Sequence, residues 1–142
     1  MIMGELALAI AAVFTGAALY VNVAEQPARL ALDDAARLSE WKVSYQRSFG
    51  IQGCVAFAGF VLATLAWRLS GDWRYALGGG VLIANWPYTV YWVMTTDRQL
   101  MSFDSATAGP RSHALIEKWG TLHMVRSALG ALSCLIFLWA GT

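Results

Sequence analysis

The sequence predicts an all-α integral membrane protein, a single domain over residues 1–142 that folds as a bundle of four transmembrane helices. The first reason is composition, because 58% of the residues are hydrophobic and 13% are charged, against about half and about a quarter in soluble proteins. The second is a set of four apolar runs, each near the ~20 residues that a helix needs to cross the hydrocarbon core. We expect spans at about 4–24, 47–69, 73–95 and 119–140.

Three of these spans follow directly from uninterrupted apolar runs. The runs Leu6–Val23, Ser48–Trp67 and Tyr75–Met94 contain no charged residue. The third includes Pro87, which has no N–H to donate to the carbonyl of Ile83. We therefore expect the third span to bend.

The fourth span must begin before its purely apolar part. Ser127–Ala140 is too short to cross about 30 Å as a helix, so the helix has to start near Gly120. His123 and Arg126 then lie one and two turns inside the membrane boundary. An arginine at that depth must reach back to the surface or find a partner, and ionisable groups at depth commonly mark function.

The distribution of positive charge predicts the orientation. With four spans, the connections 26–47 and 95–118 share one side of the membrane, and the termini share the other side with the short 68–74 turn. The two long connections hold seven Lys and Arg residues, whereas the opposite side holds Arg68 and Arg74. The positive-inside rule places the long connections in the cytoplasm and both termini outside the cell inner membrane.

We expect the first long connection to form a short interfacial helix. Leu30, Leu38 and Trp41 recur among charged residues at roughly helical spacing, and Pro27 suits the first turn of a new helix. The second connection breaks at the Gly-Pro pair 109–110 and resumes as a helix into the fourth span.

Polar and aromatic side chains collect at the cytoplasmic ends of all four spans, while the outer half is nearly all apolar. This asymmetry is the strongest functional signal in the chain. The candidate catalytic residues are His123, Arg126 and Glu25, and the candidate substrate-binding residues are Arg47, Tyr45, Tyr88, Tyr91, Trp41, Trp119 and Asn22. A structural reading stays open, because tryptophans also form the aromatic belt of membrane proteins.

Glu25 is expected to lie within salt-bridge or single-water distance of Arg126 or Arg47. It is the one acidic residue at the inner ends of the four expected spans. An unpaired charge at this depth is expensive, so the helices should pack in a way that supplies a partner.

A metal or dithiol centre has less support. His113, Glu117 and His123 are the ligand types of non-haem iron, but on a straight helix His123 points away from the other two. A haem held by two histidines is disfavoured because only His123 lies in a span. Cys54 and Cys134 are far apart and show no C-x-x-C pattern. We expect no cofactor, with metal and haem left open as weaker alternatives.

Four stretches at the inner ends of the spans carry a family resemblance. They are GAALYVNVAEQPAR, WKVSYQRSF, NWPYTVYWVMTTDRQL and WGTLHMVRSALG. On these motifs the chain resembles the anthrone-oxygenase-like membrane proteins, a family otherwise treated as a domain of unknown function. The resemblance covers nearly the whole chain and implies a four-helix membrane protein. Some relatives oxidise polyketide anthrones to anthraquinones with molecular oxygen and no recognised cofactor.

Two classes of function are compatible with these residues. One is an oxygenase or related oxidoreductase acting on a lipophilic aromatic substrate in the cytoplasmic half of the bundle. His123 would be the base, Arg126 or Arg47 would stabilise the anion, and Glu25 would orient one of these arginines.

The other class is a non-catalytic membrane subunit of a larger complex, or a quinone-, pigment- or lipid-binding module. The same polar residues would then form a structural ion-pair network. The partners expected are membrane lipid and a lipophilic small molecule, and not nucleic acid, because the net charge is +1 and the basic residues are spread. A homo-oligomer and a membrane-complex partner stay open.

Overall fold

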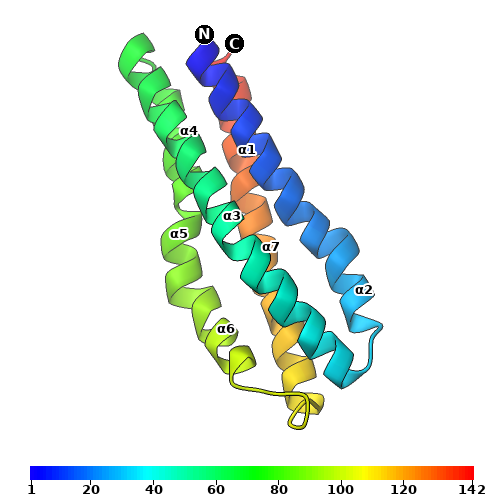
Figure 1. The fold of residues 1–142 in the computed structure, drawn as a ribbon. Coiled ribbons are helices and arrows are strands. Elements are labelled where there is room, and N and C mark those ends of the chain that lie inside the picture. Colours follow the sequence, from blue (N-terminus) through cyan, green and yellow to red (C-terminus); the bar gives the residue numbers. More distant parts are fainter.

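Four long helical segments pack side by side and run alternately down and up the bundle (Figure 1). The computed structural model describes residues 1–142, and 119 backbone hydrogen bonds hold its helices and turns. The first two segments are α1 (Ile2–Tyr20) continued by the π-helical turn η1 (Val21–Glu25) and α2 (Gln26–Leu30), and then α3 (Asp34–Ser70). The third is α4 (Trp73–Ile83), α5 (Asn85–Tyr88), the π-helical turn η2 (Thr89–Val93) and α6 (Met94–Met101), and the fourth is α7 (Pro110–Ala140).

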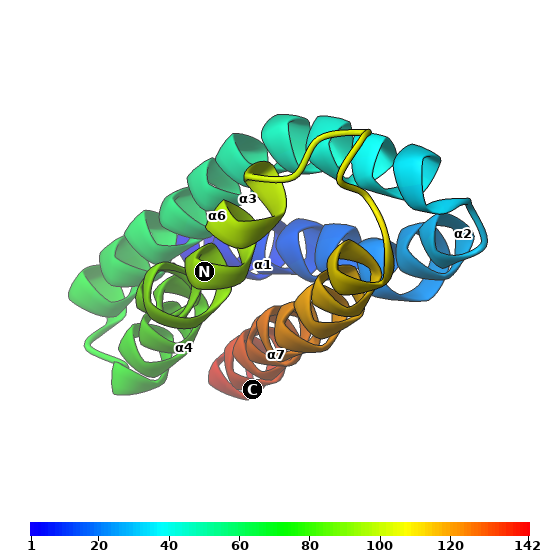
Figure 2. The same ribbon diagram turned by 90° about the horizontal axis from the view of Figure 1, so that it is seen from below.

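The segments form a ring in which each contacts two neighbours. α1 and α4 both pack against α3 and α7, whereas α1 and α4 hardly touch each other. Both termini lie at one end of the bundle, together with the α3–α4 turn. The view from the other end shows the loop that crosses from α6 to α7 (Figure 2), where the Lys42 ammonium of α3 donates to the carbonyl of Phe103.

The outside of the bundle is an apolar surface suited to lipid. Large side chains such as Val23, Ile51 and Leu69 are 66–72% exposed on it. Helical stretches over 2–30, 34–70 and 110–140 are long and apolar enough to cross a membrane, while the third segment is interrupted at Ala84 and its pieces are shorter. The prediction of an all-α membrane bundle is confirmed.

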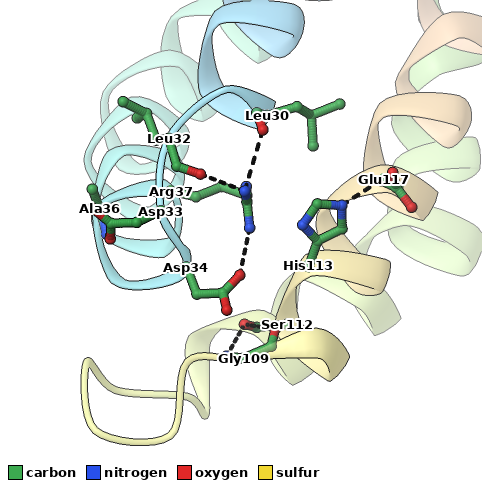
Figure 3. A network of polar contacts seen from close by, with 10 residues as sticks. All are labelled: Leu30, Leu32, Asp33, Asp34, Ala36, Arg37, Gly109, Ser112, His113 and Glu117. Carbon is green, nitrogen blue, oxygen red and sulfur yellow. Dashed lines mark hydrogen bonds and ion pairs between the residues drawn. The ribbon is translucent and has the colours of Figure 1, made fainter.

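The predicted interfacial helix in the first connection is wrong. α2 continues the first segment to Leu30 and α3 begins at Asp34, so the connection is a tight turn. Arg37 closes this turn, because its guanidinium donates to the carbonyls of Leu30 and Leu32 and pairs with Asp34 at 2.6 Å (Figure 3). Trp41 has no exposed surface. The helical spacing therefore belongs to the start of α3, which turns its apolar residues into the bundle and not toward a lipid surface.

The two π-helical turns lie beside the two prolines of these segments. The N–H of Gln26 donates to the carbonyl of Val21, five residues back, just before Pro27. The N–H of Met94 donates to Thr89 in the same way, just after Pro87. A proline leaves the carbonyl four residues earlier without its usual donor, and π turns occur mostly as single turns inside longer helices. Pro27 therefore continues a helix and does not start one.

The α3–α4 turn is capped on both sides. Gly71 ends α3 with φ of 73°, a left-handed conformation that glycine adopts without strain. The Asp72 carboxylate accepts from the N–H of Arg74 and pairs with its guanidinium at 2.8 Å. The hydrogen bonds from Arg74 hold the pKa of Asp72 below its ordinary value.

Small residues pack the half of the bundle near the termini, and this gives a test of the fold. A Cβ added to Gly78 of α4 would lie 2.5 Å from Cε1 of Phe137 on α7, whereas a Cβ on Gly80 meets nothing within 4 Å. We expect Gly78→Ala to destabilise the protein by about 1–3 kcal/mol through overpacking. Gly80→Ala should leave the thermal unfolding temperature in detergent unchanged or slightly higher. Equal unfolding temperatures for the two variants would contradict this packing.

Candidate functional site

The Asn22 side chain joins the π turn of the first segment to α7. Its Nδ2 donates to the carbonyl of Gly120 at 3.0 Å. Its Oδ1 lies 3.0 Å from Nδ1 of His123 and accepts from Oγ of Ser127 at 2.8 Å. His123 is 1% exposed, so this bond lies in the interior of the bundle.

These contacts define the tautomer of His123. A backbone carbonyl only accepts hydrogen bonds, so the amide nitrogen of Asn22 must face Gly120 and the amide oxygen must face the imidazole. The hydrogen therefore sits on Nδ1, and the lone pair sits on Nε2. No protein group hydrogen-bonds Nε2. A buried imidazole held in this way can accept a proton at Nε2.

A column of aromatic rings leads from α3 to His123. Tyr45 stacks on Trp41 at 4.9 Å, and Trp41 meets Trp119 edge to face at 6.0 Å. Trp119 lies 5.0 Å from the His123 ring, and the guanidinium of Arg29 lies 5.4 Å from the Trp119 ring centroid. The structure thus brings together four of the predicted site residues of α3 and α7.

Arg126 lies one turn beyond His123 and has no carboxylate partner. It is 8% exposed, and its Nε has no hydrogen-bond acceptor. Its guanidinium carbon lies 5.8 Å from the ring centroid of Phe14. It also lines a cavity of about 310 Å³ between α3 and the α5–η2 stretch, together with Thr89. A buried arginine that forms no direct ion pair is unusual in a purely structural role.

Asp97 is a buried acid that the sequence analysis missed. It is 2% exposed, and neither carboxylate oxygen has a hydrogen-bond partner. Tyr45 and Trp119 lie close to this carboxyl, but neither forms a hydrogen bond with it. The positive charge of Arg126 is near enough to attract the carboxylate. The sequence places Asp97 in the second connection, because it follows the third apolar run. In the structure α6 continues the helix to Met101, and this continuation turns Asp97 inward.

The predicted salt bridge of Glu25 with Arg126 or Arg47 does not form, although Glu25 and Arg47 line the same open hollow. Glu25 pairs with Arg29 one turn away, at 2.5 Å, and accepts a hydrogen bond from Ser44 of α3. The cause is the π turn, which directs Asn22 toward α7 and Glu25 toward α3.

Arg29 is the centre of a fully bonded network. It is 1% exposed and donates to Glu25, Gln26 and Glu40. Gln26 in turn donates to the carbonyl of Ile116 at 2.8 Å. Every arm of the Arg29 guanidinium thus has an acceptor, as expected of a structural ion-pair network.

The other predicted substrate-binding residues are divided between the interior and the surface. Tyr88 donates from its hydroxyl to the carbonyl of Leu122 at 2.8 Å and ties α5 to α7. Tyr91 is 72% exposed and points away from the bundle. Arg47 is exposed and lines an open hollow with Glu25 on the outside of α3. Tyr91 and Arg47 therefore do not join the group around His123.

The three side chains that could have formed an iron site do not converge. His113 bonds to Glu117 at 3.1 Å near the start of α7 (Figure 3). His123 lies deeper along the same helix and bonds to Asn22. No three His, Cys, Asp or Glu side chains are grouped closely enough to hold a metal ion.

Comparison with known proteins identifies a matching family. The sequence model of a family described as anthrone oxygenase matches residues 41–136, more than half of the chain. The matched region includes Tyr45, Asp97, Trp119, His123 and Arg126. No curated protein and no solved structure matches the chain.

The tautomer of His123 can be measured directly, because the chain has two histidines. We expect nitrogen NMR of ¹⁵N-histidine-labelled protein in detergent to show a neutral imidazole protonated on Nδ1, assigned by comparison with His113→Gln. Asn22→Ala should remove this preference, since the acceptor for Nδ1–H is lost. A hydrogen on Nε2 of His123 in the parent protein would contradict the geometry.

Proposed function

This chain belongs to the anthrone oxygenase family, and on that basis we propose that it is a membrane-embedded oxidoreductase. It uses molecular oxygen, without a resident cofactor, to oxidise a lipophilic aromatic compound. The observation that carries the proposal is the buried His123 with a free Nε2, one helical turn from the unpaired Arg126. Residues three apart on a helix are neighbours, so base and cation can act on one molecule.

The reaction class requires a base and a positive charge. A CH₂ group activated by flanking aromatic rings and a ketone loses one proton to Nε2 of His123, and its negative charge moves to the ketone oxygen. Oxygen then accepts electrons from this anion and forms a C–O bond, which gives a hydroperoxide once a proton returns. Loss of water leaves a new C=O group. One O₂ is consumed, with one oxygen atom in the product and the other in water.

The residues divide naturally between these tasks. Asn22 holds the imidazole with Nε2 free, and Arg126 stabilises the oxyanion, which is the interaction that strengthens as charge develops. Trp119 and Trp41 supply an apolar aromatic environment that makes the electrostatic interactions stronger. Asp97 is a positioning residue for Arg126, because its charge acts on that arginine from α6, which packs against α7.

The contrast between two groups of buried charges favours catalysis or binding over a purely structural role. The Arg29 group has a partner for each donor. The group around His123 leaves Asp97, the Trp41 and Trp119 indoles and Nε of Arg126 without hydrogen bonds. Buried polar groups are normally satisfied, so a cluster that is not satisfied is suited to receive a ligand.

The bundle fits a topology with four spans. The third segment would cross as an interrupted helix whose freed backbone groups are met inside the protein. The charge bias puts the connection end, and with it His123 and Arg126, in the cytoplasmic half of the cell inner membrane.

Replacement of His123 tests the assigned base. With anthrone as the substrate and oxygen uptake as the measurement, His123→Gln should lower kcat by roughly 100-fold or more, the usual range for loss of a general base. Parent activity should fall in acid, because a protonated Nε2 cannot accept a proton. His113→Gln is the matched control and should keep parent activity. Parent-like turnover by His123→Gln in a folded protein would refute the assignment.

Single-cysteine labelling tests the orientation. Ser105→Cys and Thr142→Cys, each in a Cys54→Ala/Cys134→Ala background, should react from opposite sides of membrane vesicles. We expect Ser105→Cys to be accessible from the cytoplasmic face. The reverse pattern would place the His123 end in the outer half.

A further inference from the structure

We propose that the lateral pocket between α3 and the α5–η2 stretch admits an acidic, flat aromatic molecule from the bilayer and holds its oxyanion on Arg126 and Thr89. The proposal deepens the proposed function and rests on it for the later oxidation of that molecule. Binding itself requires no turnover and can be tested separately.

The pocket exists because the third segment separates from α3 halfway along the bundle. α3 packs closely against α4 but hardly touches α5 and η2, beyond the interruption at Ala84. The resulting cavity has a volume of about 310 Å³, near the lower limit for sites that take small organic ligands. Its lining comes from α3, from the α5–η2 stretch and from Arg126 of α7.

The mouth of the pocket faces the lipid side of the bundle. Phe49, Trp86 and Val90 at its rim are 40–51% exposed on the apolar outer surface. Gly50 adds no side chain there, and a Cβ on it would meet nothing within 4 Å. A molecule dissolved in the bilayer can therefore enter between the helices without crossing water.

The walls of the pocket suit a flat ring. Trp86 stacks on Phe57 with ring centroids 5.6 Å apart, and its indole N–H donates to the carbonyl of Gly53 at 3.2 Å. These two contacts hold the indole in place beside the cavity. Aromatic rings favour stacked or edge contacts with such a wall. An acyl chain would gain no comparable contact.

The floor of the pocket is polar and lacks partners. Arg126 and Thr89 are 8% and 6% exposed, and both Nε of Arg126 and the hydroxyl of Thr89 are without hydrogen-bond partners. Asp97, Tyr45 and Tyr88 face Arg126 from α6, α3 and α5, but none forms an ion pair with it. Both residues line the cavity, so an oxyanion there would lie beside the guanidinium of Arg126 and the side chain of Thr89. The positive charge selects a phenolate or enolate over an uncharged aromatic.

The two cysteines make the pocket directly testable. Cys54 lines it, whereas Cys134 lies near Thr15 on another face. In Cys134→Ala protein in detergent, we expect 1-naphthol to slow the reaction of Cys54 with a maleimide at least fivefold. The matched ether 1-methoxynaphthalene should protect much less. Arg126→Gln should abolish the difference between the two probes, and Thr89→Val should reduce it.

Two further variants keep the test decisive if Arg126→Gln does not fold. Arg126→Lys retains the charge and should keep the preference for naphthol. Gly50→Leu should lower naphthol affinity at least tenfold in a fluorescence titration, and Gly16→Leu, an equally open glycine on α1, should not. Equal protection by naphthol and its ether, or equal affinity of the two leucine variants, would overturn the proposal. Protection by phosphatidylglycerol would overturn the choice of an aromatic ligand.

The results separate this inference from the proposed function. Arg126-dependent naphthol binding in a protein that does not oxidise anthrone would support the pocket and reject the oxygenase. Oxidation of anthrone with a KM unchanged by Gly50→Leu would support the oxygenase and reject the pocket.

Discussion

The amide of Asn22 is the contact on which the candidate site depends. It spans from the π turn of the first segment to α7, and it binds Gly120, His123 and Ser127 at once. Because the carbonyl of Gly120 can only accept a hydrogen bond, the backbone of α7 sets the orientation of this amide. The amide oxygen then faces the imidazole of His123 and fixes its hydrogen on Nδ1. The close approach of the two segments is equally important. A Cβ on Gly120 would lie 2.6 Å from the Gln26 amide nitrogen, so a larger residue there would push the segments apart.

The interior near the connections contains two kinds of polar cluster with different physical character. The Arg29 cluster satisfies its donors and locks α2 to the start of α3. The cluster around His123 and Arg126 does not satisfy its own groups, and in a low-dielectric interior such groups are expensive. The fold keeps both clusters side by side, and under the proposed function the first stabilises the protein while the second binds the substrate.

Two prolines and two π turns determine how these clusters are placed. The turn before Pro27 directs Asn22 and Glu25 to different neighbours. The interruption near Pro87 and the π turn after it separate the third segment from α3 and open the lateral pocket beside Arg126. Irregular backbone at this depth is tolerated where neighbouring protein meets the freed groups, so such irregularities commonly mark functional sites in membrane bundles.

The fold class of the protein and the region of its candidate site could be predicted from the sequence alone. Apolar runs of membrane-spanning length, a polar group at the inner end of each run, and the motifs around His123 and Arg126 were sufficient for the all-α bundle, its family and its polar half. Those features depend on local composition and helical spacing, and both can be read directly from the amino-acid sequence. The pairing of charges was decided only by the tertiary structure. Glu25 binds Arg29, Asp97 turns inward, Tyr91 turns outward, and the expected interfacial helix becomes the start of α3. The physical reason is that one π turn, or one helix continued past its expected end, rotates every later side chain to a new face, and no count of residues along the chain reveals that rotation.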